Sequence, residues 1–328
     1  MTRPLSRRTF LFGALAAPVL GPSIARAAGT GDKVRIGMIA CGGQAEFSWR
    51  NLTDQEMVML CDVDLARTAA AAQTFPKAEV VQDFRRVIDR NDIDAVVVAT
   101  PDHWHAIPSV WAMQTGKHVY CEKPLAHSIH EIRVMEETAR DKRRVTQMGT
   151  QIHAGGNYRR VVELVQAGAI GPVKRVDVWC EKQPSPGKRS SQGMAPSSLD
   201  YDLWVGPAPY RPFDPQIVPF NWRWWWDFGG GVLADMACHY MDLPHWALNL
   251  RHPERVSAQG TEFPDADNKV PVEMRVDFHY PAREEQPPVH LTWWHGIRGP
   301  RGEDGQVQNL GVGSGVLFHG ENGQLLAD

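Results

Sequence analysis

Short apolar runs alternate with helical patterns over residues 34–148, and this alternation restricts the fold more than any other feature of the chain. Each run has the length of a strand, and alanine-rich or amphipathic stretches such as Asp64–Thr74 and Ile129–Asp141 separate the runs. Continuous apolar strands with intervening helices indicate a parallel sheet that is covered on both faces. The sequence therefore predicts a doubly wound α/β domain at residues 28–148. The runs are Val34–Ala40, Met57–Cys61, Ala95–Ala99, His118–Cys121 and Val145–Met148.

The pattern changes after Gly149. A helix is expected from Asn157 to Ala167, where Gly168 ends it, and residues 183–198, rich in Pro, Gly and Ser, indicate a long loop. Apolar and polar residues alternate in the segments 273–280 and 289–293, which predicts antiparallel strands with one buried and one wetter face. We expect a second, α+β domain at residues 149–328, built on a large open, mainly antiparallel sheet.

The end of the chain carries a hairpin signal. Val316–Phe318 leads into Asn322-Gly323, a dipeptide typical of tight turns, and the returning strand then has few residues left. We interpret this as a sheet and a chain that are incomplete at the C-terminus. The alternative is a natural terminus on a short edge strand.

Residues 1–27 have the pattern of a targeting segment. The paired Arg7-Arg8 precede an apolar stretch and a small-residue site, Ala25–Ala27, which predicts a twin-arginine signal peptide and export, for example to the periplasm. The stretch is too short and too interrupted for a stable membrane span. Five cysteines without a C-x-x-C spacing suggest neither a disulfide framework nor a zinc ribbon. A net charge of −3 shows no nucleic-acid footprint.

The first predicted strand runs into a partial dinucleotide fingerprint. Against G-x-G-x-x-G, the chain has Ala40, Gly42 and Ala45, with Gly43 and Gln44 between them. The middle glycine, which lets the backbone approach a pyrophosphate, is present. Asp62 follows the second run, where a carboxylate accepts hydrogen bonds from a ribose hydroxyl and repels a 2′-phosphate. The pattern favours NAD over NADP in a Rossmann domain, although Asp62 could instead be a helix N-terminal acid.

Two further strand ends carry polar residues that should face the same cofactor. Thr100-Pro101 follows the third run and directs the loop toward His105, and Glu122-Lys123 follows the fourth. Ligands of open α/β sheets lie over these carboxyl ends. His103 and His105 have no third ligand at a suitable spacing, so no metal site is predicted.

Asp235 and His239 are four residues apart in an apolar stretch that is predicted to be helical, so they should share one helix face. Together with Lys123, they would supply what alcohol oxidation requires: a group that takes the hydroxyl proton and groups that orient the substrate. The alternative is a surface pair without chemistry.

These features resemble the glucose–fructose oxidoreductase, inositol dehydrogenase and rhizopine-catabolism family (Gfo/Idh/MocA). The segments that carry the resemblance are Ala99–Ala106, Glu122–Ala126, Gly168–Val173 and Asp235–His239. The resemblance implies that Lys123 contacts nicotinamide and substrate, that His239 accepts the proton and that Asp235 orients the substrate. It also implies a homo-oligomer.

The chain departs from the family at several positions. Ala40 replaces the first fingerprint glycine, and Gln151 and His153 stand where many relatives carry Asn and Arg, so the substrate pocket is expected to differ. The leader and the Trp222–Asp227 block resemble an exported branch that processes glycans. Tryptophans in this block form either core packing or a platform for sugar rings.

Three functions remain open. The first is an exported oxidoreductase that moves hydride between a sugar or polyol carbon and tightly held NAD. The second is an NAD-dependent glycosidase that works by transient oxidation and elimination. The third is an inert or merely cofactor-binding fragment, if the chain is incomplete.

Overall fold

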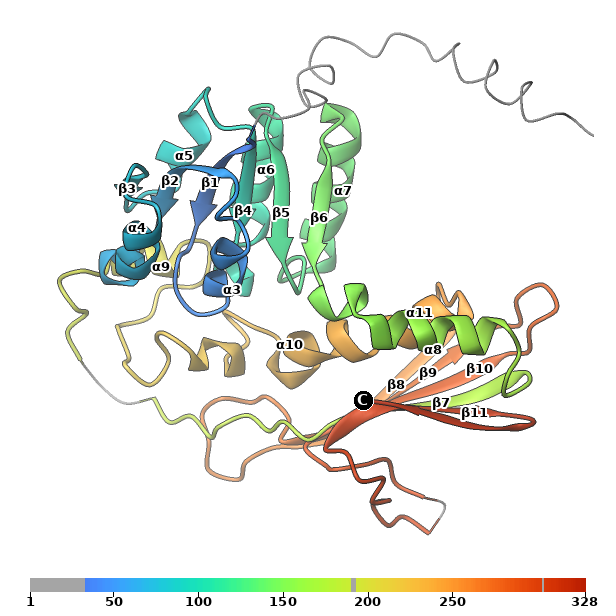
Figure 1. Cartoon of the computed structure of the whole chain (residues 1–328). Helices are drawn as coiled ribbons and strands as arrows, with labels where there is room; N and C mark the ends of the chain where they lie inside the picture. Colours follow the sequence, from blue (N-terminus) through green and yellow to red (C-terminus); the bar gives the residue numbers. More distant parts are fainter. Residues whose placement is uncertain (1–32, 190–192, 303) are drawn as a thin grey trace, which may run out of the picture. The chain divides into compact units, whose positions relative to one another are not determined.

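A computed structural model describes residues 33–189, 193–302 and 304–328, so the predicted signal peptide lies outside the described residues. The first half of this range forms a six-stranded sheet of order β3-β2-β1-β4-β5-β6, in which every neighbouring pair is parallel (Figure 1). The predicted parallel sheet is thus confirmed. Its strands are β1 (Arg35–Ile39), β2 (Glu56–Cys61), β3 (Glu79–Val81), β4 (Ala95–Val98), β5 (His118–Glu122) and β6 (Thr146–Gly149).

Helices cover both faces of this sheet, as the doubly wound prediction requires. On one face, Trp49 of α3 and Ala71 of α4 pack with Met38 of β1. On the other face, Val87 of α5 and Met113 of α6 join a separate cluster that α7 completes. The helices are α3 (Ala45–Arg50), α4 (Ala69–Thr74), α5 (Arg85–Asp89), α6 (Ala106–Gln114) and α7 (Ile129–Lys142), with 3₁₀ turns at Leu65–Thr68, Asp102–Trp104 and Gln151–Ala154.

A second six-stranded sheet has the order β12-β11-β7-β10-β9-β8. Only β7 and β10 pair in parallel, so the mainly antiparallel prediction is confirmed. The predicted hairpin joins β11 to β12, with Gly320 opposite Gly323, so its turn lies one residue earlier than expected. The strands are β7 (Val173–Cys180), β8 (Arg255–Thr261), β9 (Glu273–Tyr280), β10 (Val289–His295), β11 (Ser314–Gly320) and β12 (Gly323–Ala327).

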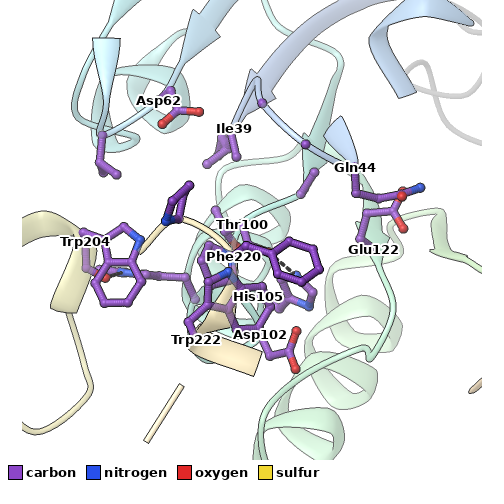
Figure 2. Close-up of a pocket in the computed structure, with 18 of the residues that line it drawn as sticks. Ile39, Gln44, Asp62, Thr100, Asp102, His105, Glu122, Trp204, Phe220 and Trp222 are labelled. Carbon is purple, nitrogen blue, oxygen red and sulfur yellow. Dashed lines mark hydrogen bonds between the residues drawn. The ribbon is translucent and has the colours of Figure 1, made fainter. Parts of the chain in front are cut away.

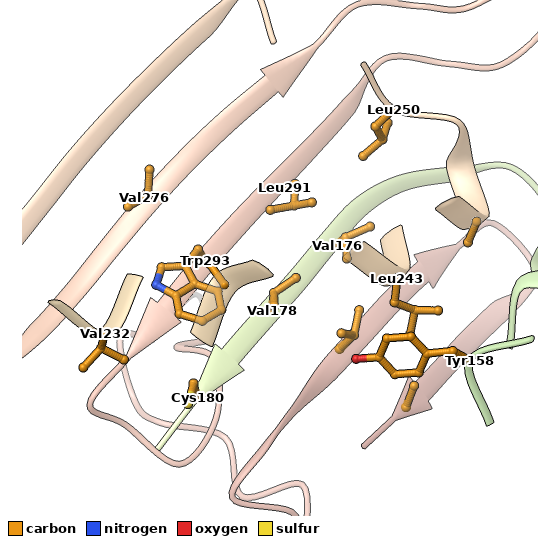
Figure 3. Close-up of a cluster of buried hydrophobic side chains, with 14 of the residues drawn as sticks. Tyr158, Val176, Val178, Cys180, Val232, Leu243, Leu250, Val276, Leu291 and Trp293 are labelled. Carbon is orange, nitrogen blue, oxygen red and sulfur yellow. The ribbon is translucent and has the colours of Figure 1, made fainter. Parts of the chain in front are cut away.

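Helices pack on one face of the second sheet and bury its main core. Figure 3 shows Val178 and Trp293 on neighbouring strands, with Leu243 of α11 and Tyr158 of α8 packed on this core. The predicted helix is confirmed as α8 and ends before Gly168, which has a left-handed φ of 76°. The elements are α8 (Gly156–Gln166), α9 (Tyr201–Val205), α10 (Gly231–Tyr240) and α11 (Asp242–Leu248), with a 3₁₀ turn at Asn221–Trp224.

The opposite face of the second sheet is drier than the sequence predicts. Trp294 and Thr292 point to this face and are only 6% and 2% exposed. Trp294 donates a hydrogen bond to the fully buried Asp177, and Ile297 and Leu310 pack against the Trp294 cluster. The expectation of a wetter face is therefore correct for residues such as Arg275 and His290 but wrong at Thr292, where the segment after β10 packs against the Trp294 cluster.

Within the described ranges, no helix combines the length and apolarity that crossing a bilayer requires. The five cysteines are free. The parts of the 183–198 segment that the structure describes contain no helix or strand, as predicted.

Candidate functional site

A cavity of about 670 Å³ lies at the carboxyl ends of β1, β2, β4 and β5. The strand order reverses between β1 and β4, and open α/β sheets bind ligands at such a switch point. Trp204, Phe220 and Trp222 complete the wall and face the strand ends in Figure 2. The residues predicted for cofactor binding and catalysis all line the cavity: Gly42, Gly43, Gln44, Asp62, Thr100, Pro101, His105, Glu122, Lys123, Asp235 and His239.

The glycine-rich turn forms the upper wall of this cavity. Ala40, which replaces the first fingerprint glycine, adopts a left-handed φ of 72°, and Gly43 has a φ of 63°. Glycine visits this region at little cost, whereas alanine is strained there. At Gly42, an added Cβ would lie 2.5 Å from the guanidinium of Arg67, which therefore lies across the turn. The turn thus has a left-handed residue at position 40, which glycine would supply without strain.

Asp62 directly follows β2 beside this turn, and backbone amides hold its carboxylate. The amides of Cys41 and Asp64 donate hydrogen bonds of 2.9 and 3.0 Å to its two carboxylate oxygens. Burial raises the pKa of Asp62, and these two hydrogen bonds oppose the rise. The carboxylate is thus fixed where a ribose hydroxyl can donate to it, with Arg67 Nε 3.9 Å away.

Three residues that line the cavity each carry a polar atom that is buried without a hydrogen-bond partner in the described part of the chain. The atoms are the hydroxyl of Thr100, on the loop after β4, Oε2 of Glu122, at the end of β5, and Nδ1 of His239, on α10. Buried polar groups are normally hydrogen-bonded, and an orphan atom at a cavity wall suits a polar ligand. With the Arg67 guanidinium beside Gly42, a cation suited to a pyrophosphate, and the carboxylate of Asp62, these atoms fit a nicotinamide dinucleotide.

The loop residues around His105 hold the lysine-bearing segment in place. Each ring nitrogen of His105 contacts a backbone carbonyl, that of Pro124 at 2.6 Å and that of Thr100 at 2.8 Å. Burial lowers the pKa of His105. The ring therefore braces the Thr100 loop against the Lys123-Pro124 segment, and this contact gives it a positioning role beside the cofactor role predicted for it.

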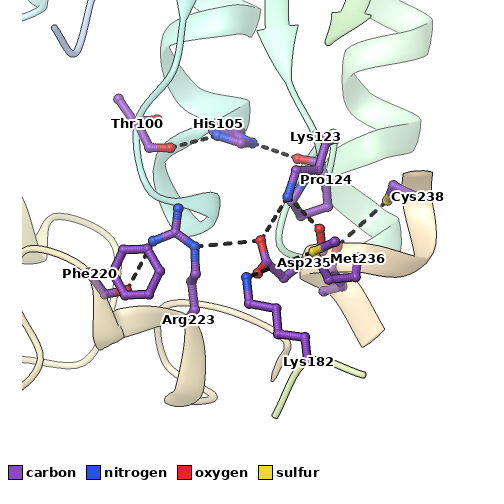
Figure 4. A network of polar contacts seen from close by, with 11 residues as sticks. Thr100, His105, Lys123, Pro124, Lys182, Phe220, Arg223, Asp235, Met236 and Cys238 are labelled. Atoms are coloured by element: carbon purple, nitrogen blue, oxygen red, sulfur yellow. Dashed lines mark hydrogen bonds and ion pairs between the residues drawn. The ribbon is translucent and has the colours of Figure 1, made fainter. Parts of the chain in front are cut away.

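Lys123 and Asp235 meet across 112 residues of sequence. The Lys123 ammonium donates to Asp235 Oδ1 at 2.8 Å and also to the Asp235 backbone carbonyl. Lys182 donates to Oδ2 at 2.6 Å, and Arg223 Nε lies 3.6 Å from Oδ1 (Figure 4). Burial raises the pKa of Asp235, but the charges and hydrogen bonds of Lys123 and Lys182 outweigh it and hold the pKa well below its usual range. Asp235 is ionised at neutral pH.

Two neighbouring groups have pKa values shifted toward their neutral forms. Burial, followed by the charge of Lys123, lowers the pKa of His239 to about 4, so its imidazole is neutral at physiological pH. Burial raises the pKa of Asp102 to about 8, although the charge of Lys123 opposes this. Ionisable groups in a cleft whose pKa values are strongly shifted are typical of functional sites.

Of the three predicted substrate residues, Asp235 lines the cavity, whereas Gln151 and His153 lie elsewhere. Neither Gln151 nor His153 lines the cavity. His153 pairs with Asp242 at 2.6 Å and stacks on Trp246, because the 3₁₀ turn that carries it packs near α11. The structure does not bring these two residues together with Lys123 and His239.

Several residues that line the cavity were not predicted from the sequence. Lys182 follows β7 in a loop with no motif, and Arg223 lies in the tryptophan block that drew attention only for its rings. Trp222, Trp224 and Trp225 are buried, so core packing accounts for most of this block, while Trp222 also lines the cavity. Asp102 lies in Ala99–Ala106, one of the segments that carry the family resemblance, but only its burial in the structure marks it as a functional candidate.

Two family models match the chain in sequence. The model described as "Oxidoreductase family, NAD-binding Rossmann fold" matches residues 34–150, and the model described as "Oxidoreductase family, C-terminal alpha/beta domain" matches residues 164–282. Together they include both sheets except β10 to β12.

Inositol 2-dehydrogenase 3 of Saccharopolyspora erythraea is 38% identical over 144 residues, which are 42% of this chain and 42% of that protein. A glycosyl hydrolase family 109 protein of Shewanella sp. (strain W3-18-1) is 30% identical over 153 residues, which are 43% of this chain and 33% of that protein. The match thus spans less than half the length of either curated relative. The crystal structure of myo-inositol 2-dehydrogenase from Lactobacillus plantarum superimposes with a TM-score of 0.65 at 18% identity, covers 90% of this chain and 76% of that one, and so shows the shared fold.

Proposed function

Because this chain belongs to the Gfo/Idh/MocA oxidoreductase family, whose NAD-binding and C-terminal domains both match it, we propose that it is an NAD-dependent oxidoreductase acting on a sugar or polyol. It would transfer hydride between a hydroxyl-bearing carbon and a tightly held nicotinamide. The relationship to an inositol dehydrogenase and a glycosyl hydrolase supports a carbohydrate substrate.

The observation that carries the proposal is the meeting of Lys123, Asp235 and neutral His239 in the cavity beside Thr100. Oxidation of an alcohol requires a base for the hydroxyl proton. His239 is neutral because burial and Lys123 lower its pKa to about 4, and its buried Nδ1 lacks a protein partner within the described residues. It can therefore accept the proton at physiological pH.

Lys123 and Asp235 position the reacting hydroxyl. An ammonium group has three donors, and Lys123 uses two on Asp235, which leaves one for the substrate oxygen. Asp235 stays ionised because the ammonium of Lys182 donates to its other oxygen and stabilises the negative charge. The ionised carboxylate in turn holds the ammonium of Lys123 in place. Gly42, Asp62 and Thr100 would hold the cofactor, and a bound nicotinamide would supply the hydride acceptor.

The test begins with the cofactor. Protein purified without added nucleotide and denatured with acid should release stoichiometric NAD or NADH. Turnover of a panel of sugars and polyols should then fall at least about a hundredfold in Lys123→Met while bound NAD is retained. Lys174→Met, which removes an exposed lysine paired with Glu321 away from the cavity, is the matched control. Undiminished turnover in Lys123→Met would remove that residue from the mechanism, and a protein that never binds NAD would favour the inert alternative.

Export and assembly are further parts of the proposal. The paired Arg7-Arg8 and the apolar stretch after them support twin-arginine export of the cofactor-loaded protein, for example to the periplasm. Cell fractionation tests this directly. A homo-oligomer rests on the family resemblance alone, and the mass of the protein in solution decides it.

A glycosidase is the second candidate, and the glycosyl hydrolase family 109 relative favours it. The same three residues would oxidise the sugar transiently, and NAD would be regenerated on the protein. Release of a free sugar from a glycoside without net NADH separates this outcome from net oxidation.

A further inference from the structure

The substrate side of the cavity carries more positive than negative charge. Lys123, Lys182 and Arg223 converge on the single carboxylate of Asp235, and their side chains are only 12%, 33% and 20% exposed. Asp102 is the other acid on this side, and burial raises its pKa to about 8, so it is largely protonated at neutral pH. The remaining charged residues of the lining, Asp62, Asp64, Arg67 and Glu122, belong to the side of the glycine-rich turn.

Arg223 has donors to spare. Its Nη1 donates to the carbonyl of Phe220 at 3.0 Å, whereas its Nε is 3.6 Å from Asp235, which is too far for a strong hydrogen bond. The guanidinium lies 4.4 Å from the ring centroid of Phe220 and 4.3 Å from that of Trp222, between two aromatic faces (Figure 4 shows the Phe220 contact). Nη2 is left without a protein partner in the part of the chain that the structure describes. A planar guanidinium held in this way suits bidentate binding of an anion.

Lys182 adds a second cation with free capacity. Its ammonium donates to Asp235 and to Sδ of Met236, 3.9 Å away, which leaves one of its three donors, and it lies 5.5 Å from the ring centroid of Trp224. Both oxygens of Asp235 are already engaged by Lys123 and Lys182, so this carboxylate offers little to neutralise Arg223. Partly buried cations without full compensation are costly unless a ligand supplies the missing charge.

From this arrangement we infer that the substrate is an anionic sugar, and that Arg223 and Lys182 bind its carboxylate or phosphate group while Lys123 and His239 face the hydroxyl that reacts. This inference rests on the proposed function, because it concerns the same cavity. It assigns substrate selection to Arg223 and Lys182, which lie beside the proposed catalytic residues.

The test compares charged sugars with neutral partners of the same stereochemistry. NAD-loaded protein is titrated with D-glucuronate, its uncharged methyl ester and D-glucose, with the corresponding galactose series, and with D-glucose 6-phosphate, and binding is followed by calorimetry. At least one acid or phosphate should bind about tenfold or more tightly than its neutral partner, a difference of about 1.4 kcal/mol. The carboxylate and phosphate arms identify the anion.

Variants assign the preference to the two cations. Arg223→Met should remove about tenfold of the preference, Lys182→Met should also reduce it, and Arg223→Lys should restore part of it. Lys174→Met should keep it in full. Retention of bound NAD and an unchanged circular dichroism spectrum show that each variant is folded.

The result that overturns the inference is equal or tighter binding of the neutral sugars, no binding of any anionic sugar at millimolar concentration, or a full preference in both cation variants. Oxidation of neutral sugars with bound NAD would leave the proposed function intact while this inference fails. Tight binding of an anionic sugar without any redox change would support this inference while the proposed function fails.

Discussion

His103 allows a test of how far burial lowers the pKa of a histidine in this protein. Its ring is 3% exposed, its Nε2 lies 3.0 Å from the carbonyl of Trp204, and its Nδ1 is buried without a partner among the described residues. Burial lowers the pKa of His103 from 6.5 to about 4. Because the native pKa lies below that of the unfolded chain, the unfolded chain takes up the proton first as the pH falls. The stabilising effect of the neutral ring is therefore complete above the unfolded pKa and is lost toward the native pKa.

The magnitude follows from the two pKa values. Between neutral pH and about pH 4.5, a histidine with a pKa of 6.5 when unfolded and about 4 when folded lowers the free energy of unfolding by about 2 kcal/mol. Asp102 acts in the opposite direction, since burial raises its pKa to about 8. The pH dependence of the whole protein mixes these effects, so only a comparison with a variant isolates His103.

The assay is urea unfolding, monitored by tryptophan fluorescence, of the parent and of His103→Gln at both pH values. The glutamine amide can still donate to the Trp204 carbonyl but does not titrate. Between the two pH values, the free energy of unfolding should fall by about 2 kcal/mol less in the variant than in the parent, whatever the stability of the variant at neutral pH. His130→Gln, on the exposed side of α7, is the control because its side chain stays in water in both states. An identical loss in parent and His103→Gln would refute the burial argument.

Two further predictions concern the cofactor side of the cavity. Ala40→Gly should raise the free energy of unfolding by about 0.5–1 kcal/mol in the same assay, because the left-handed φ of 72° strains alanine. Ala70→Gly, on the exposed face of α4, should instead lower it by about 1 kcal/mol, and a loss in both variants would contradict the reasoning. Asp62→Ser should shift the ratio of NAD to NADP affinity at least about tenfold toward NADP, because the carboxylate repels a 2′-phosphate and Arg67 lies 3.9 Å from it. Isothermal titration with both cofactors measures this ratio, and an unchanged ratio would mean that Asp62 does not select the cofactor.

The strands of the first sheet show how far the sequence leads. Buried parallel strands such as β4 consist of consecutive apolar residues, so their position is visible locally. The β3 strand was not predicted, because its three residues are largely exposed and carry no such run. The short helix α3 was not predicted either, because its six residues are too few to show a helical repeat of apolar residues.

The candidate site divides in the same way. Gly42, Asp62 and Lys123 follow strand ends, and parallel strands bring their carboxyl ends to one edge, so the sequence by itself placed these residues together. The i to i+4 spacing of Asp235 and His239 placed those two on one helix, and α10 confirms that helix. The helical repeat makes such a pair predictable.

What only the tertiary structure decided is which charges meet. Lys182 lies 53 residues from Asp235, and no local repeat connects a loop after β7 to a helix. The same holds for the neutral state of His239 and the raised pKa of Asp102, because both depend on burial by distant segments. Local patterns follow from backbone geometry over a few residues, whereas burial and ion pairing depend on how separate elements pack. The sequence therefore determined the fold class and the edge of the first sheet where the predicted cofactor residues lie. The packing of separate elements determined which charges line the cavity around Asp235.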